Sequence, residues 1–249
     1  MSTKNWPSTT LGEISDQVGG LLQTGPFGSQ LHESDYSDEG VPVVMPKDII
    51  EGRVATNSIA RILPHHVDRL SRHKLADGDI VYGRRGDIGR QALIRKTEQG
   101  WLCGTGCLRI SLGRSVIEPE FLHYYLRQPS VIDWIAKKAV GATMPNLNTG
   151  ILRSIPVPVP PLPVQHRIAG ILSTYDELIE NSQRRIRLLE DMARALYREW
   201  FVHFRFPGHE RLAKPNTTRK ARPAGVSICE DANQSVPRLP SALGDIPQG

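Results

Sequence analysis

The sequence contains little cysteine and no long uninterrupted apolar run. Its 249 residues include three cysteines, Cys103, Cys107 and Cys229, and a small, odd number fits a reducing cytoplasm. No stretch approaches the roughly 18 uncharged apolar residues that a membrane-spanning helix needs. Residues 1–10 also lack the apolar segment of a signal peptide. We therefore expect a cytoplasmic protein.

Several catalytic signatures are missing as well. The chain has no G-x-x-x-x-G-K-S/T loop, which argues against a P-loop ATPase, and it has neither G-x-S-x-G nor H-E-x-x-H. It also lacks a tetrapeptide that begins N-P-P or D-P-P, of the kind that adenine methyltransferases use, and a glycine-rich strand-to-helix cofactor loop. The sequence favours a non-catalytic binding subunit over an enzyme.

Metal-binding patterns are weak throughout. Cys103 and Cys107 are four residues apart without a companion pair, so we interpret them as two small apolar residues in or beside a strand. The three histidines between residues 65 and 73 lie among arginines and lysines, which indicates a solvated basic segment. The acidic residues 32–40 lack calcium-loop spacing and its closing glutamate. No metal site is expected.

The charge balance points toward an acidic partner. The formal net charge is +5 and the isoelectric point is about 9.2. A mildly basic chain of this kind is compatible with nucleic-acid binding.

Residues 1–155 predict an α+β domain. Short apolar runs bounded by glycine and proline read as strands, and a helical period follows at 118–140 with Pro129 as a break. The expected strands lie within 41–46, 79–83, 91–96 and 107–112. We expect the helices to cover one side of a curved sheet.

A proline-rich hinge at 156–163 leads into a long helix at 164–206 with a heptad repeat. Its apolar positions are spaced alternately four and three residues apart, with Ser182 in the one gap. They are Ile168, Leu172, Tyr175, Ile179, Ile186, Leu189, Ala193, Leu196 and Trp200. Such a repeat predicts a coiled-coil seam. No second run exists in the chain, so the partner helix must come from another copy or another protein. The alternative is that the helix packs on its own domain.

The segment after the helix has a different composition. Residues 207–249 are rich in proline, serine, asparagine and basic residues and have little periodic apolar content. We expect this tail to be mostly disordered.

Four stretches resemble one known family. They are TGPFGSQL at 24–31 followed by VPVVMPKDI at 41–49, DGDIVYGRRGDIGRQALI at 77–94, GATMPNLNTGILRSIPVPVPPLPVQHRIAGIL at 141–172, and DELIENSQRRIRLLEDMARALYREWFVHFRFPG at 176–208. Together they resemble the DNA specificity subunits of type I restriction–modification systems.

The resemblance implies two target recognition domains, each reading half of a split DNA site, and two long helices that pack antiparallel as a spacer. It implies methyltransferase subunits that bind S-adenosylmethionine and methylate adenine at N6. It also implies restriction subunits that translocate DNA with ATP and Mg. These cofactors belong to the partner subunits, and none is expected in this chain.

This chain has one recognition domain and one helix. Residues 242–249, ALGDIPQG, look like the lead-in to a second repeat, and residues 5–14 look like what would follow. We therefore expect a half-subunit that forms a homodimer or pairs with a second half-subunit. A product of a split or rearranged gene and a decayed fragment are the alternatives.

Candidate DNA-binding residues lie on glycine-flanked turns. Lysines and arginines suit phosphate contacts, and Arg, Asn, Gln, Ser and Thr can read base edges. The candidates are Ser29, Gln30, Lys47, Arg84, Arg85, Arg90, Thr143 and Asn146. The alternative for each is a solvated or capping residue, and the resemblance does not name the bases.

The heptad residues favour antiparallel pairing of two copies with a midpoint near Arg184. Ala193 then faces Tyr175 and Trp200 faces Ile168, which fills space evenly. The aromatic segment 200–208 is a candidate contact for the methyltransferase. One rival function is a coiled-coil regulator or inhibitor that occupies the methyltransferase without DNA specificity. A second rival, an enzyme in its own right, would bind S-adenosylmethionine or Mg²⁺ itself.

Overall fold

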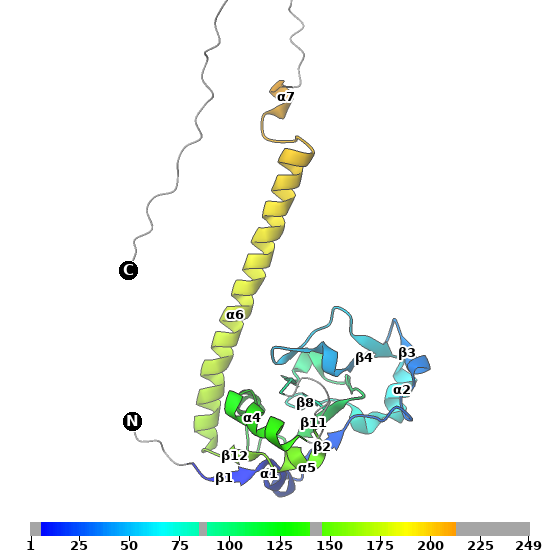
Figure 1. Cartoon of the computed structure of the whole chain (residues 1–249), viewed down its shortest axis with the longest axis vertical. Coiled ribbons are helices and arrows are strands. Elements are labelled where there is room, and N and C mark those ends of the chain that lie inside the picture. Colours follow the sequence, from blue (N-terminus) through cyan, green and yellow to red (C-terminus); the bar gives the residue numbers. More distant parts are fainter. Residues whose placement is uncertain (1–5, 85–88, 140–145, 213–249) are drawn as a thin grey trace, which may run out of the picture. The chain divides into compact units, whose positions relative to one another are not determined.

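The structure is a computed structural model that describes residues 6–84, 89–139 and 146–212 (Figure 1). The chain divides into two compact units between Ile186 and Arg187. The expectations for Arg85, Thr143, Cys229 and the tail after Leu212 fall outside the described residues.

The first unit holds all of the strands found in the described residues. They are β1 Ser8–Thr10, β2 Leu21–Thr24, β3 Tyr36–Ser37, β4 Val41–Val44, β5 Ile49–Ile50, β6 Arg53–Val54, β7 Ala60–Ile62, β8 Ile80–Gly83, β9 Gln91–Leu93, β10 Leu102–Cys103, β11 Cys107–Ser111 and β12 Pro156–Pro158. The α-helices of the described ranges are α1 Leu11–Val18, α2 Pro64–Arg69, α3 Pro119–Leu126, α4 Pro129–Lys138, α5 Thr149–Arg153, α6 Leu162–Tyr197 and α7 His209–Leu212.

The expected strands and the helix break are confirmed, because β4, β8, β9 and β11 occupy the predicted segments and α4 begins at Pro129. The expectation of one curved sheet is wrong. Two four-stranded sheets form instead, in the orders β2-β11-β8-β9 and β10-β4-β7-β3. The chain passes from one to the other between β10 and β11, through a turn at residues 104–106.

The strand β8 shows why the first sheet needs cover on both faces. All four of its residues are buried. Ile80 and Tyr82 join a core cluster with the helices, whereas Val81 joins a second cluster with Cys103 and Cys107. Because successive strand residues point to opposite faces, both faces of the sheet are packed.

Helices cover one face of this sheet, as predicted. Leu11 and Ile14 of α1, Phe121 of α3, Ile135 of α4 and Leu152 of α5 pack in the same cluster as the sheet residues. Figure 1 shows α1, α4 and α5 beside β2 and β11.

The two described cysteines are buried, unpaired strand residues, as the sequence predicted. Burial raises the pKa of the Cys103 thiol to about 12, so the thiol is a poor nucleophile at neutral pH. The expectation of a solvated histidine segment is wrong for His73, which is 1% exposed. Its Nε2 accepts a hydrogen bond from Nε of Arg72 at 3.0 Å.

The proline-rich hinge is partly a strand. β12 pairs antiparallel with β1, with Thr9 opposite Val157. The helix α6 begins at Leu162, slightly before the predicted start, because Pro163 can occupy a first helical turn, where its missing N–H costs little.

Gln165 fixes the start of α6 to the domain. Its side chain is fully buried. Nε2 donates to the carbonyls of Pro160 at 2.8 Å and Val116 at 3.1 Å, and Oε1 accepts from the backbone N–H of Glu118 at 2.7 Å. One amide thereby satisfies two backbone groups just before α3, at Val116 and Glu118, and one just before α6, at Pro160.

Replacing Gln165 by leucine is expected to lower the free energy of unfolding by at least about 3 kcal/mol, because three buried backbone groups lose their partner. Urea unfolding of the full chain measures the change. Gln183→Leu is the matched control, since Gln183 is exposed on the same helix and should stay within about 0.5 kcal/mol of the parent. Equal effects of the two substitutions would contradict the anchoring role.

His123 is a buried histidine of α3. Its Nδ1 lies 2.9 Å from Oε1 of Gln91, and Nε2 of Gln91 donates to the His123 carbonyl at 2.8 Å. Burial, helped by the Arg127 charge, lowers the pKa of His123 from 6.5 to about 3. As the pH falls, His123 therefore takes up a proton at a higher pH in the unfolded chain than in the folded chain.

This low pKa predicts a pH dependence of stability. The contribution of neutral His123 to the free energy of unfolding is complete above pH 6.5 and is lost as the pH falls toward 3. Over this range the free energy of unfolding falls by up to about 1.4 kcal/mol per pH unit. In urea unfolding between pH 7 and 4, the stability difference between the parent and His123→Asn should shrink as the pH falls. A difference independent of pH would show that His123 does not titrate in this way.

Candidate nucleic-acid interface

The described DNA-binding candidates lie in loops at one edge of the first sheet. The registers Leu108↔Thr24 and Cys107↔Gly83 place the end of β2, the start of β11 and the end of β8 together. β4 and β10 pair in parallel and also end together. We call the loops next to these strand ends, together with Asn146, which contacts Arg84, the strand-end edge. Its described residues are 25–30, 45–48, 84, 89–90, 104–106 and 146.

Close backbone contacts hold these loops together. The N–H of Gly25 donates to the Cys107 carbonyl at 2.9 Å, and the N–H of Gly104 donates to the Val44 carbonyl at 2.9 Å. A Cβ atom on Gly25 would lie only 2.1 Å from the carbonyl oxygen of Gly104. Glycine is therefore required where the loop after β2 meets the turn before β11.

Arg84 and Asn146 are brought into contact although 62 residues separate them. Nε of Arg84 donates to Oδ1 of Asn146 at 3.1 Å. The backbone of Arg84 is fixed as well, since its N–H donates to Gly106 at 2.8 Å and its carbonyl accepts from Leu147 at 2.9 Å. The side-chain contact uses Nε, and the two terminal nitrogens are the donors that a bidentate contact with guanine requires.

Two further cations lie on the same edge. Lys47 is exposed on a 3-10 turn, Pro46–Asp48, which the buried Asp48 closes by accepting from the Met45 N–H at 3.0 Å. Arg90 is exposed, and its carbonyl accepts from Gly83 at 2.8 Å. Exposed cations at this edge suit contacts with phosphates.

Ser29 and Gln30 belong to the turn after β2. Ser29 is exposed. Oε1 of Gln30 accepts from the Phe27 N–H at 3.1 Å, so this side-chain oxygen serves the turn itself. That geometry corresponds to the capping alternative that the sequence left open.

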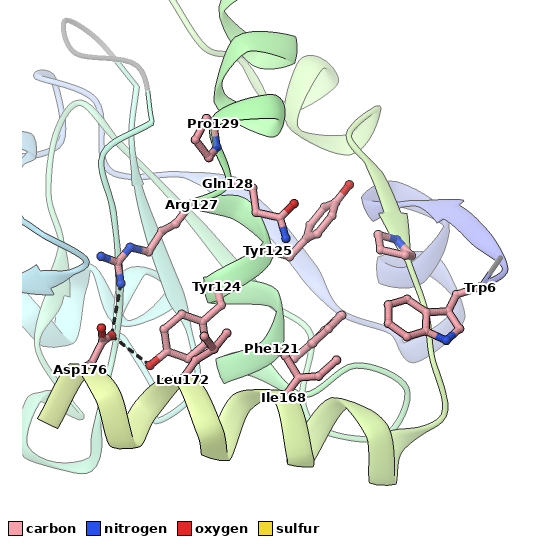
Figure 2. Close-up of a pocket in the computed structure, with 11 residues that line it drawn as sticks. Trp6, Phe121, Tyr124, Tyr125, Arg127, Gln128, Pro129, Ile168, Leu172 and Asp176 are labelled. Carbon is pink, nitrogen blue, oxygen red and sulfur yellow. Dashed lines mark hydrogen bonds and ion pairs between the residues drawn. The ribbon is translucent and has the colours of Figure 1, made fainter. Parts of the chain in front are cut away.

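A pocket of about 670 Å³ lies between α3 and the first turns of α6 (Figure 2). Trp6, Phe121 and Tyr125 contribute aromatic walls. Asp176 accepts from the Tyr124 hydroxyl at 3.0 Å and pairs with Nη1 of Arg127 at 3.3 Å. Tyr124, Arg127 and Asp176 thus bond to one another rather than facing the pocket unpaired. Together with the Arg53–Glu180 ion pair at 2.7 Å, these contacts attach α6 to the domain.

Most of the heptad seam is exposed, as far as the described residues show. Ile168 packs against the domain core, as expected for a helix on its own domain. Exposed fractions of the later large seam side chains range from 38% at Leu172 to 62% at Leu189. Packing on the domain therefore accounts only for the start of the seam.

The end of α6 and the residues just after it carry further exposed apolar side chains outside the heptad positions. They include Leu188, Met192, Tyr197, Phe201, Val202 and Phe204. The α-helix passes into a π-helical turn, Arg198–Val202, which contains Trp200 and Phe201, and the ring of Phe201 stacks on that of Tyr197.

The described residues show no group of three or more histidine, cysteine or acidic side chains that could hold a metal ion. Within the same part of the chain, no helix is both long and apolar enough to cross a membrane.

Comparisons with known proteins bear on this arrangement. The family model for the type I restriction modification DNA specificity domain matches residues 4–191. The MjaIX specificity subunit of a type I restriction enzyme from Methanocaldococcus jannaschii is 24% identical over 230 residues, which cover 90% of this chain and 50% of that protein.

Solved structures show the same fold. The S subunit of a type I restriction-modification system from M. genitalium aligns with a TM-score of 0.56 at 20% identity, covering 86% of this chain and 50% of that one. The HsdS subunit from Thermoanaerobacter tengcongensis aligns with a TM-score of 0.51 at 22% identity, covering 78% and 48%. The chain thus spans about half the length of these relatives.

Proposed function

The chain belongs to the type I restriction modification DNA specificity family, and we propose that it is a non-catalytic, sequence-specific DNA-binding subunit. Its recognition domain reads one half of a bipartite target. Its helix scaffolds adenine-N6 methyltransferase subunits and, with them, restriction subunits. The observation that carries the proposal is the meeting of Arg84 with Asn146 at an edge that also presents Lys47.

In this proposal the strand-end edge divides the work of binding. The terminal nitrogens of Arg84, oriented by Asn146, donate to O6 and N7 of a guanine in the major groove. Lys47 and Arg90 contact phosphates and set the register of the domain on the duplex. The contact with Asn146 orients the Arg84 side chain before DNA arrives, which lowers the entropy cost of binding.

The partners follow from the exposed part of α6. The heptad seam takes a second helix, from another copy of the chain or from a second half-subunit. The additional apolar residues around Leu188 and Phe201 are exposed, and they supply a surface for the methyltransferase. S-adenosylmethionine then belongs to that subunit, ATP and Mg²⁺ belong to the restriction subunit, and this chain carries no cofactor.

Co-expression with a cognate type I methyltransferase subunit, followed by genome-wide mapping of N6-methyladenine, tests the function. We expect new methylation at a split motif, and a palindromic motif if two copies of the chain pair. A strain with the methyltransferase alone is the control. Co-purification without new methylation would contradict the proposal and favour a regulator that lacks DNA specificity.

A further inference from the structure

Phe27 is a large apolar side chain that stands out from the strand-end edge. It is 53% exposed. The preceding Pro26 is buried, and a Cβ atom placed on the following Gly28 would meet no other atom of the described residues within 4 Å. The ring therefore lies on the exposed side of this turn. Sequence reasoning took Ser29 and Gln30 from this turn and overlooked the ring between its glycines.

The turn is held in a fixed conformation. The carbonyl of Phe27 accepts from the N–H groups of Gln30 at 2.8 Å and Leu31 at 3.2 Å, while its own N–H donates to Oε1 of Gln30. Leu31 is 4% exposed and anchors the turn in a core cluster with Val43 and Ile62. The N–H and the carbonyl of Phe27 thus both form hydrogen bonds within the turn. The other residues of the turn, 28–30, have no large apolar side chain that could cover the ring.

The surroundings of Phe27 indicate its partner. Gly25, two residues before it, packs on Gly104, and this turn lies on the same edge as Lys47 and Arg84. An exposed apolar ring on an edge that also carries cations matches duplex DNA, where phosphates attract the cations and base steps or thymine methyl groups accept an apolar side chain. An apolar protein partner would leave these cations without counter-charges.

We propose that Phe27 is a specificity-determining apolar wedge that packs against the base pairs of the target half-site, and that Gln30 positions it. The inference rests on the proposed DNA-binding function. It assigns Gln30 an indirect role, because its side-chain oxygen holds the turn that presents the ring.

The test compares the parent with Phe27→Ala and Phe27→Leu, each as the complex with the methyltransferase subunit. Titrations use a duplex with the methylated motif from the mapping experiment and a duplex with that motif scrambled. Phe27→Ala should raise the Kd for the motif about tenfold and leave the Kd for the scrambled duplex and the salt dependence unchanged. Phe27→Leu should retain most of the affinity because it keeps apolar area.

Leu21→Ala is the matched control, since Leu21 is 41% exposed at the opposite end of β2 from this turn, and it should bind like the parent. An unchanged Kd for Phe27→Ala, or equal losses on both duplexes, would overturn the wedge. A parent complex that binds both duplexes equally is a different result, because it would overturn the proposed function and the wedge with it.

Discussion

Replacing Leu189 and Leu196 by aspartate is expected to convert a dimer of the chain into monomers. Both side chains lie on the heptad seam and are more than half exposed, at 62% and 51%. Burying a leucine in a helix pair contributes about 1.5–3 kcal/mol, and a symmetric pair loses four of them. The expected cost is therefore on the order of 6 kcal/mol or more, before the penalty of burying carboxylates.

Light scattering over a range of concentrations measures the change. The control is Asn181→Asp with Ala195→Asp, which adds the same two negative charges at exposed positions of α6 that helical geometry turns away from the seam. The control protein should remain a dimer. A dimer that survives the leucine substitutions would place the interface elsewhere. If the unsubstituted chain is itself a monomer, the partner of the seam is a helix of another protein.

Replacing Arg84 by alanine is expected to weaken binding to the target motif by about 1–3 kcal/mol, because a bidentate contact with guanine is lost. Fluorescence anisotropy on motif and scrambled duplexes measures the difference. Arg84→Lys should recover little of the specificity, since an ammonium group keeps the charge without the planar fork. The backbone bonds of Arg84 remain in either variant, so the domain should fold.

Lys47→Ala serves as the comparison. A phosphate contact acts equally on all sequences, so this variant should weaken both duplexes and reduce the salt slope by about one. Asn146→Ala tests the orientation of Arg84, and its effect should be small in an Arg84→Ala background because the two residues act together. Equal affinity of the parent and Arg84→Ala for the motif would remove Arg84 from base recognition.

Some features of this protein were readable from short stretches of sequence. The strands β4, β8, β9 and β11 follow from apolar runs bounded by turn residues, and Pro129 marks the start of α4 because proline is tolerated only at the beginning of a helix. The heptad spacing of α6 left an apolar seam, and most of it is exposed. Each of these signals lies within a few neighbouring residues, where backbone sterics and side-chain periodicity act directly.

The tertiary structure decided how these pieces meet. It divided the predicted sheet in two, buried His73, and turned the Gln30 oxygen toward its own turn. It also brought Arg84 to Asn146 across 62 residues. Contacts of this kind depend on strand order and on which loops share an edge, and no local period encodes either. The sequence by itself therefore determined these strands, the break at Pro129, the long helix and the family resemblance, whereas packing between distant segments determined the candidate DNA-reading surface.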